Sequence, residues 1–231
     1  MFEAGGIWCG YEADIDVIKG LDFTVGQEVF AILGANGAGK TTLLSAIAGL
    51  LPLTSGSIRF GGKTISGVPP WRIAALGIGF VPQERGVFPD LTVLDNLRVG
   101  GLVAKHARGE RIDEIMELFP ALADLRNQRA GTLSGGETKM VAAGRALMQD
   151  AKLLLMDEPT AGLSPLYVEN FFDRIRRIHE TKGVAIIITE QNATKALEVA
   201  DRAMVLSLGE AMTITDAKDL TTDQLRKGYK I

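Results

Sequence analysis

The glycine-rich stretch 34–41, GANGAGKT, limits the possible folds more than any other segment of the chain. It matches the pattern G-x-x-x-x-G-K-[ST] in full, and it lies between an apolar run, 29–33, and a segment, 41–51, with apolar residues at helical spacing. Strand, glycine loop and helix is the context that a phosphate-binding loop requires, because glycines let backbone N–H groups turn onto phosphate oxygens and the helix adds its positive end. The predicted phosphate-binding residues are Gly34, Ala35, Asn36, Gly37, Ala38, Gly39, Lys40 and Thr41.

Two side chains of this loop have specific expected tasks. In such a loop the lysine, Lys40, reaches the β- and γ-phosphates, and the hydroxyl of Thr41 ligates Mg²⁺. The alternative is a flexible glycine turn that opens a helix, and the flanking strand and helix patterns argue against it.

Further apolar runs predict a parallel sheet. The runs 77–83, 152–158 and 183–189 are short, apolar and separated by helical patterns, which is typical of a doubly wound α/β sheet. The segment 56–65 reads as a hairpin with a Gly-Gly turn and, with the N-terminal segment, predicts a small antiparallel sheet. We expect one domain over 1–231, with residues 1–86 and 148–231 forming the core and the β subdomain and residues 87–147 forming a helical subdomain.

A pair of acids closes the second of these strands. Asp157 and Glu158 follow four apolar residues in KLLLMDEPT. A carboxylate at this position can hold Mg²⁺, and a second one can activate a water against a γ-phosphate. With the phosphate loop, this pair predicts a nucleoside triphosphatase.

Composition narrows the function classes. The net charge is −3 and there is no long basic run, so the sequence does not favour a nucleic-acid partner. Cys9 is the only cysteine, which excludes an intrachain disulfide and favours a reducing compartment. The N-terminus lacks the pattern of a secretory signal and no apolar run is long enough to cross a bilayer, so we expect a chain that is soluble by itself.

A third motif identifies a family. The stretch TLSGGETKM, 132–140, places a serine and two glycines at the start of a predicted helix, where an anion can bind; a simple serine N-cap is the alternative. In this order and spacing, Ser134, Gly135, Gly136 and Glu137 resemble the signature of ATP-binding-cassette (ABC) ATPases. The resemblance covers nearly the whole chain: GANGAGKTT is similar to the Walker A loop, LLLMDEP to Walker B, and GLSP to the D-loop.

The resemblance implies a P-loop NTPase fold with a RecA-like parallel sheet, ATP and Mg²⁺ as ligands, and roles for individual residues. Thr42 joins the nucleotide-binding residues, Gln83 in FVPQ resembles the Q-loop glutamine and joins Thr41 and Asp157 around Mg²⁺, and Glu158 resembles the catalytic carboxylate. Tyr11 is the preferred aromatic for stacking on adenine and Trp8 is the alternative, while a core role for either stays open. Thr138 and Ser164 depart from the common signature and D-loop residues.

Several segments resemble the ATPases of branched-chain or hydrophobic amino-acid importers, among them VPQERGVFPDLTVLDNL and TEQNATKALEVADR. This resemblance implies a second ABC ATPase subunit, identical or related, that contributes its signature to the site, transmembrane permease subunits, and indirectly a solute-binding protein. The expected location is the cytoplasmic face of the inner (plasma) membrane, as a peripheral subunit. Three alternatives stay open: the ATPase of a urea or amide importer, an ABC ATPase without a transporter, and a regulatory subunit that does not hydrolyse ATP.

The end of the strand 183–189 carries the most unusual feature. Most of the superfamily has a histidine after this strand, and here the corresponding residue is Gln191. The only histidines, His106 and His179, lie elsewhere in the sequence, and we expect both to be solvated. If the strand extends to Gln191, alternation places Thr189 and Gln191 on one face and Glu190 on the other. Because an amide can bond both phosphate and water, the sequence predicts Gln191, with Glu158 and Lys40, as a catalytic residue.

Overall fold

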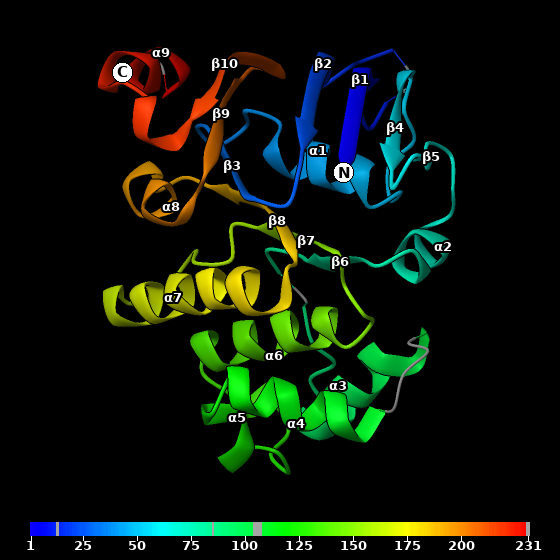
Figure 1. The fold of residues 1–231 in the computed structure, drawn as a ribbon, viewed down its shortest axis with the longest axis vertical. Coiled ribbons are helices and arrows are strands. Elements are labelled where there is room, and N and C mark those ends of the chain that lie inside the picture. The colour runs from blue at the N-terminus through cyan, green and yellow to red at the C-terminus, as the bar shows by residue number, and fades with distance from the viewer. Residues whose placement is uncertain (13, 85, 104–107, 230–231) are drawn as a thin grey trace.

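Two β-sheets and a group of helices make up the fold (Figure 1). The computed structural model describes residues 1–12, 14–84, 86–103 and 108–229. His106 therefore lies outside the described residues. Within them, no helix has both the length and the apolar character needed to span a membrane.

The larger sheet has six strands in the order β10-β9-β3-β8-β7-β6. All neighbouring strands run parallel except β9 and β10, which are antiparallel. Every residue of β3, β7 and β8 is buried, because helices cover both faces of a parallel sheet, and this explains their uninterrupted apolar runs. The expected α/β fold is confirmed. The strands are β3 (Val29–Leu33), β6 (Ile78–Val81), β7 (Leu153–Asp157), β8 (Ala185–Glu190), β9 (Arg202–Ser207) and β10 (Glu210–Asp216).

The smaller sheet is antiparallel and has the order β2-β1-β4-β5. Its strands are β1 (Phe2–Cys9), β2 (Ile18–Val25), β4 (Ser55–Phe60) and β5 (Lys63–Thr64). The predicted Gly-Gly hairpin is present: Gly61 and Gly62 have φ values of 56° and 77° and join β4 to β5. Apolar residues of this sheet share one core cluster with α1 (Lys40–Ile47) and with the face of the larger sheet that carries Phe30 and Ile32.

Helix α1 is shorter than the sequence predicts. The apolar pattern extends to Leu51, but the helix ends at Ile47, and Leu51 lies outside it. The reason is local: Gly49 adopts φ 73°, a left-handed conformation that commonly ends a helix. The next helix, α2 (Pro70–Ala75), precedes β6 and starts with a proline at its first position, where the missing N–H costs no hydrogen bond.

The helices between β6 and β7 gather at one end of the molecule, in green in Figure 1. Their apolar faces share a core cluster with the side of the larger sheet that carries Ala31 and Leu33. These elements are α3 (Val93–Gly100), η1 (Gly101–Val103), α4 (Arg108–Leu118), α5 (Ala121–Asp124), η2 (Ala130–Thr132) and α6 (Gly135–Leu147).

Three helices follow in the last third of the chain. The long helix α7 (Pro165–Lys182) leads into β8, and α8 (Ala193–Val199) connects β8 to β9. After β10 and the short turn η3 (Ala217–Asp219), helix α9 (Thr222–Tyr229) packs against β9 and β10 (Figure 1). The end of α9 thereby lies beside the carboxyl ends of β3 and β8.

Candidate functional site

A pocket of about 540 Å³ lies at the carboxyl ends of β3, β7 and β8. In open α/β sheets ligands bind at this edge. Segments from distant parts of the sequence meet here, and they include most of the residues predicted for nucleotide and metal binding. The lining residues are Tyr11, Val17, Asn36, Gly37, Gly39, Lys40, Thr41, Thr42, Gln83, Glu158, Ala161 and Gln191.

The loop between β3 and α1 needs its glycines for backbone reasons. Gly39 has φ 106°, and a Cβ there would lie 2.9 Å from a methyl carbon of Ile18. At Gly34 a Cβ would lie 2.3 Å from the carbonyl oxygen of Leu206. Only glycine fits either position, and the chain then enters α1 directly at Lys40. The N-terminal end of α1 is a favourable site for an anion.

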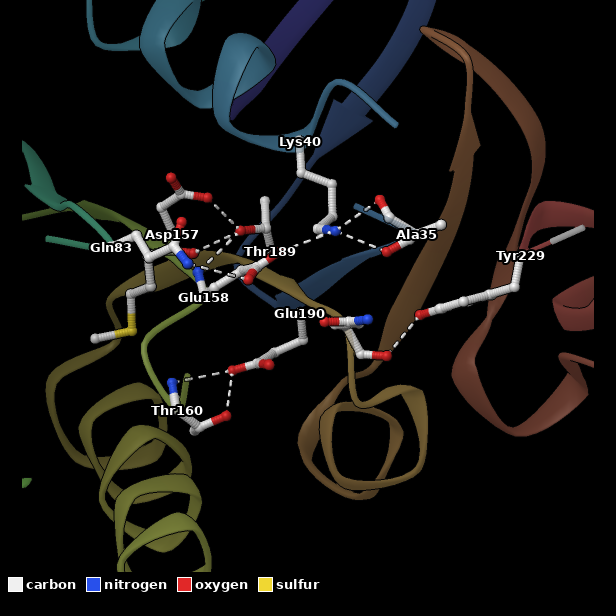
Figure 2. A network of polar contacts seen from close by, with 12 residues as sticks. Ala35, Lys40, Gln83, Asp157, Glu158, Thr160, Thr189, Glu190 and Tyr229 are labelled. Atoms are coloured by element: carbon white, nitrogen blue, oxygen red, sulfur yellow. Dashed lines mark hydrogen bonds and ion pairs between the residues drawn. The ribbon is translucent and has the colours of Figure 1, made fainter. Parts of the chain in front are cut away.

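Lys40 is the central cation of the pocket. Its ammonium group donates to the carbonyl oxygens of Gly34 at 2.7 Å and Ala35 at 3.1 Å, and lies 3.0 Å from Oε1 of Glu158 (Figure 2). The side chain is 4% exposed. A phosphate that binds in the loop would therefore compete with the Glu158 carboxylate for this charge.

Asp157 is a buried carboxylate at the end of β7. The hydroxyl of Thr189, on the neighbouring strand β8, donates to its Oδ1 at 2.8 Å. Burial raises the pKa of the Asp157 carboxyl above its ordinary value, and hydrogen bonds from Thr189 and Thr41 offset part of this rise. The link to Thr41 joins two of the three residues that are predicted as metal ligands, the third being Gln83.

Glu158 has a strained backbone. Its φ is 40°, in the left-handed region that non-glycine residues rarely adopt, and such strain concentrates at functional sites. Its backbone N–H donates to both the carbonyl and the hydroxyl oxygen of Thr189, each at 3.1 Å, which holds the conformation. The carboxylate also accepts a hydrogen bond of 3.4 Å from the side-chain amide of Gln83.

Glu190 is a residue that sequence reasoning missed. It is 3% exposed, and its Oε1 accepts hydrogen bonds from the hydroxyl of Thr160 at 2.7 Å and from the Thr160 backbone N–H at 3.3 Å (Figure 2). Burial raises the pKa of this carboxyl, and the hydrogen bonds from Thr160 offset part of the rise. The one sign of this in the sequence is the alternation of side chains along the strand, which places Glu190 on the face opposite to Thr189.

A second missed residue is Lys139, on α6. Its ammonium group donates to the backbone carbonyl of Gln83. Burial lowers the pKa of Lys139, while nearby carboxylates, Asp157 and Glu190 first among them, act in the opposite direction. The side chain thus connects the helix that follows the signature to the Q-loop glutamine, and nothing in its local sequence indicates this.

Gln191 follows β8, which ends at Glu190, so the strand does not extend to it as the alternation argument supposed. Gln191 is exposed and lines the pocket. His179 lies near the end of α7, with Nδ1 3.0 Å from the carbonyl oxygen of Val184; it is half-buried rather than solvated. Because Val184 precedes β8, His179 lies at the opposite end of that strand from Gln191.

The two candidate adenine-stacking residues separate in space. Tyr11 is 66% exposed and lines the pocket. Trp8 lies on β1 with its indole against Gly20, and it does not line the pocket. Of the two, the structure brings only Tyr11 near the phosphate loop.

The signature residues lie at the start of α6. Ser134 is the N-cap, its hydroxyl accepts from the backbone N–H of Glu137, and the Glu137 carboxylate accepts from the Ser134 N–H at 2.8 Å. A Cβ at Gly136 would lie 2.4 Å from the ring of Tyr167 on α7, which explains the second glycine. None of Ser134, Gly135, Gly136 and Glu137 lines the phosphate pocket of the same chain.

The chain is similar to known proteins over most of its length. The model of the ABC transporter family matches residues 18–161. The high-affinity branched-chain amino acid transport ATP-binding protein BraG of Pseudomonas aeruginosa is 42% identical over 227 residues, which are 97% of this chain and 94% of that protein. The probable branched-chain amino acid transport ATP-binding protein LivF of Archaeoglobus fulgidus is 38% identical over 211 residues, 91% of this chain and 86% of that protein.

A solved structure shares the fold. It is a dimeric, post-hydrolysis state of an ATP-binding cassette bound to ADP and Pi. The TM-score is 0.85 and the identity 23%, and the match covers 95% of this chain and 100% of that chain.

Proposed function

The chain belongs to the ABC transporter family, and from this premise we propose that it is the ATP-hydrolysing subunit of an importer for branched-chain or other hydrophobic amino acids. The observation that carries the proposal is the pocket that joins Lys40, Thr41, Gln83, Glu158 and Gln191. Two relatives named as branched-chain amino acid transport ATP-binding proteins match almost the whole chain and support the choice of solute.

The donor set around Asp157 suits Mg²⁺. A carboxylate, the Thr41 hydroxyl and the Gln83 amide oxygen are hard oxygen donors, as this ion prefers. The described residues include no cluster of three His, Cys, Asp or Glu side chains that could hold a metal without other ligands. This fits an ion that shares phosphate oxygens with the protein, where it would neutralise charge developing on the phosphates.

The residues of the pocket have separate roles in ATP hydrolysis. The loop N–H groups and Lys40 hold the phosphates, and Glu158, once displaced from Lys40, orients and polarises the attacking water. The side-chain amide of Gln191 donates a hydrogen bond to the γ-phosphate. Because the amide carries no charge, this contact does not titrate. Tyr11 stacks on the adenine in this arrangement.

A second ABC ATPase subunit, identical or related, completes the site. The signature of one chain does not reach its own phosphate pocket, so the signature of the partner caps the γ-phosphate in a head-to-tail dimer. Residues 87–147 move as one helical subdomain during closure, and the Lys139–Gln83 contact links this movement to the phosphates.

The permease docks on a groove of about 340 Å³ between α2, α3 and α6. Its wall includes the exposed apolar side chains of Leu50, Trp71 and Phe88, and the Arg145 guanidinium lies 5.0 Å from the Phe88 ring centroid. Buried Asn96 fixes the Phe88 backbone with two hydrogen bonds, of 2.8 and 3.0 Å. In this proposal the chain works as a peripheral subunit on the cytoplasmic face of the inner membrane, and a solute-binding protein acts through the permease.

The proposal is tested by ATP hydrolysis and by assembly. Glu158→Gln should abolish turnover and accumulate an ATP-bound dimer on a sizing column, whereas Glu210→Gln, at an exposed residue of β10, should behave as the unmodified chain. A Glu158→Gln chain that binds ATP·Mg²⁺ and stays monomeric would contradict the dimer.

Assembly separates the importer from the alternatives. The chain should co-purify with membrane permease subunits, and Trp71→Ala should weaken this association without changing ATP hydrolysis by the purified chain. An active chain that co-purifies with no membrane subunit would favour an ABC ATPase that has no transporter. Uptake of urea instead of leucine by the assembled complex would favour the urea importer.

A further inference from the structure

The last described residue, Tyr229, reaches Gln191 from the end of α9. Its phenolic hydroxyl donates a hydrogen bond of 2.9 Å to the backbone carbonyl of Gln191 (Figure 2). The two residues are 38 positions apart in the sequence. Tyr229 does not itself line the phosphate pocket, whereas Gln191 does.

The Tyr229 hydroxyl lies beside the point at which strands β3 and β8 end. Strands β3 and β8 pair in parallel, and the last residues in register are Leu33 and Glu190. The residues that directly follow the two strands are Gly34, which begins the phosphate loop, and Gln191. The Tyr229 hydroxyl donates to the Gln191 carbonyl and lies near the Gly34 backbone, so it bridges the two strands one residue beyond their last register pair. A side chain thereby takes the place of the backbone pair that would otherwise fix Gln191.

Tight packing holds α9 in the position that this contact needs. A Cβ at Gly228 would lie 2.0 Å from a methyl carbon of Val205 on β9, so only glycine lets the end of α9 approach the sheet. At the other end of the helix, the Gln224 side chain accepts hydrogen bonds from the backbone and the hydroxyl of Thr221 at 2.9 and 3.0 Å. These two bonds cap the start of α9 locally, and Gln191 takes no part in them.

The hydroxyl remains a donor at physiological pH. Burial raises the pKa of Tyr229 to about 12, and the hydrogen bond to the Gly34 backbone offsets part of the rise. The phenol therefore stays neutral, and phenylalanine would keep its packing while removing the hydroxyl, with its bond to the Gln191 carbonyl and its interaction with the Gly34 backbone.

We propose that Tyr229 is a positioning residue for catalysis: it fixes the backbone of Gln191, so that the Gln191 amide points at the γ-phosphate, and α9 thereby controls the orientation of that amide. This inference rests on the proposed role of Gln191 in ATP hydrolysis. Without this anchor, the two-residue connection between β8 and α8, Gln191 and Asn192, would let the amide sample orientations that do not contact the phosphate, which lowers the rate without weakening nucleotide binding.

The test is a double-mutant cycle with Tyr229→Phe and Gln191→Ala, in which kcat and KM for ATP are measured separately. Tyr229→Phe should lower kcat about fivefold, the size expected for one neutral hydrogen bond, with KM within about twofold. In the Gln191→Ala background the same change should have an effect on kcat below about twofold, because no amide remains to be oriented. Gln224→Ala removes the local cap at the start of α9 and leaves the Gly228 contact and Tyr229 in place, so it should leave kcat unchanged.

Several results would overturn the inference. An unchanged kcat in Tyr229→Phe would mean that Tyr229 does not act through Gln191. An equal loss of kcat in the unmodified and Gln191→Ala backgrounds would mean the same. A raised KM in both backgrounds would assign the effect of Tyr229 to the phosphate loop. If the unmodified chain does not hydrolyse ATP, the proposed function fails, and amide hydrogen exchange decides the structural claim. Exchange at residues 191–193 should then accelerate about fivefold in Tyr229→Phe and not in Gln224→Ala, and equal exchange in both refutes it.

Discussion

Replacing Thr189 by valine tests the link between β8 and the acidic end of β7. The Thr189 hydroxyl is fully buried, donates to Asp157 Oδ1 at 2.8 Å and accepts from the Glu158 N–H at 3.1 Å. Valine has nearly the same shape, so the change removes the hydroxyl and leaves the packing in place. The Glu158 N–H keeps a partner in the Thr189 carbonyl oxygen, so the main loss is the hydrogen bond to the carboxylate.

The expected cost follows from that bond. A hydrogen bond to a charged group contributes about 1.5–3 kcal/mol, so we expect Thr189→Val to lower the free energy of unfolding by about 2 kcal/mol. For a chain of 231 residues this corresponds to a fall in Tm of roughly 4–8 °C. Thr181→Val is the matched control, because the Thr181 hydroxyl is exposed and bonds only to its own helix, at the Arg177 carbonyl; its effect should stay within about 0.5 kcal/mol.

The cost should also depend on pH. Burial raises the pKa of Asp157, so this group stabilises the fold fully below its ordinary pKa of 3.8, and the contribution is lost as the pH rises through the raised value. Losing the Thr189 bond raises that pKa further, so the variant should lose more stability at neutral than at acidic pH. Urea unfolding at both pH values measures this. A Thr189→Val chain as stable as Thr181→Val at neutral pH would refute the reasoning.

Three further predictions concern other buried groups. Glu190→Gln keeps a hydrogen-bond acceptor for Thr160 but carries no charge. Because burial raises the pKa of Glu190, the variant should gain stability over the unmodified chain as the pH rises above 4.5. Midpoints of urea unfolding that shift equally at all pH values would contradict this. Cys9 is fully buried and burial raises its pKa to about 11, so a disulfide reagent at pH 8 should label the folded chain at least about 100-fold more slowly than the chain in urea; equal rates would exclude a buried thiol. Gly136→Ala places a Cβ against the Tyr167 ring and should cost about 1–3 kcal/mol, whereas Gly109→Ala on α4, which meets no atom within 4 Å, should cost nothing; similar unfolding midpoints for the two would refute the packing argument.

The sequence by itself determined the fold class and the phosphate loop, because both are written in local patterns. The fully buried strands β3, β7 and β8 appear as uninterrupted apolar runs, and the loop between β3 and α1 needs glycines at fixed positions. The same patterns missed the end of α1, since its apolar spacing continues past Ile47 and only the left-handed Gly49 ends it.

The tertiary structure alone decided which side chains support the site. Thr189 meets Asp157 because β7 and β8 pair in that register, and Glu190 meets Thr160 across 30 positions of sequence. Tyr229 reaches Gln191 only because Gly228 lets α9 pack closely on β9. Such contacts join residues whose separation in sequence carries no periodicity, and strand register and helix docking, not local propensity, set the distances between them.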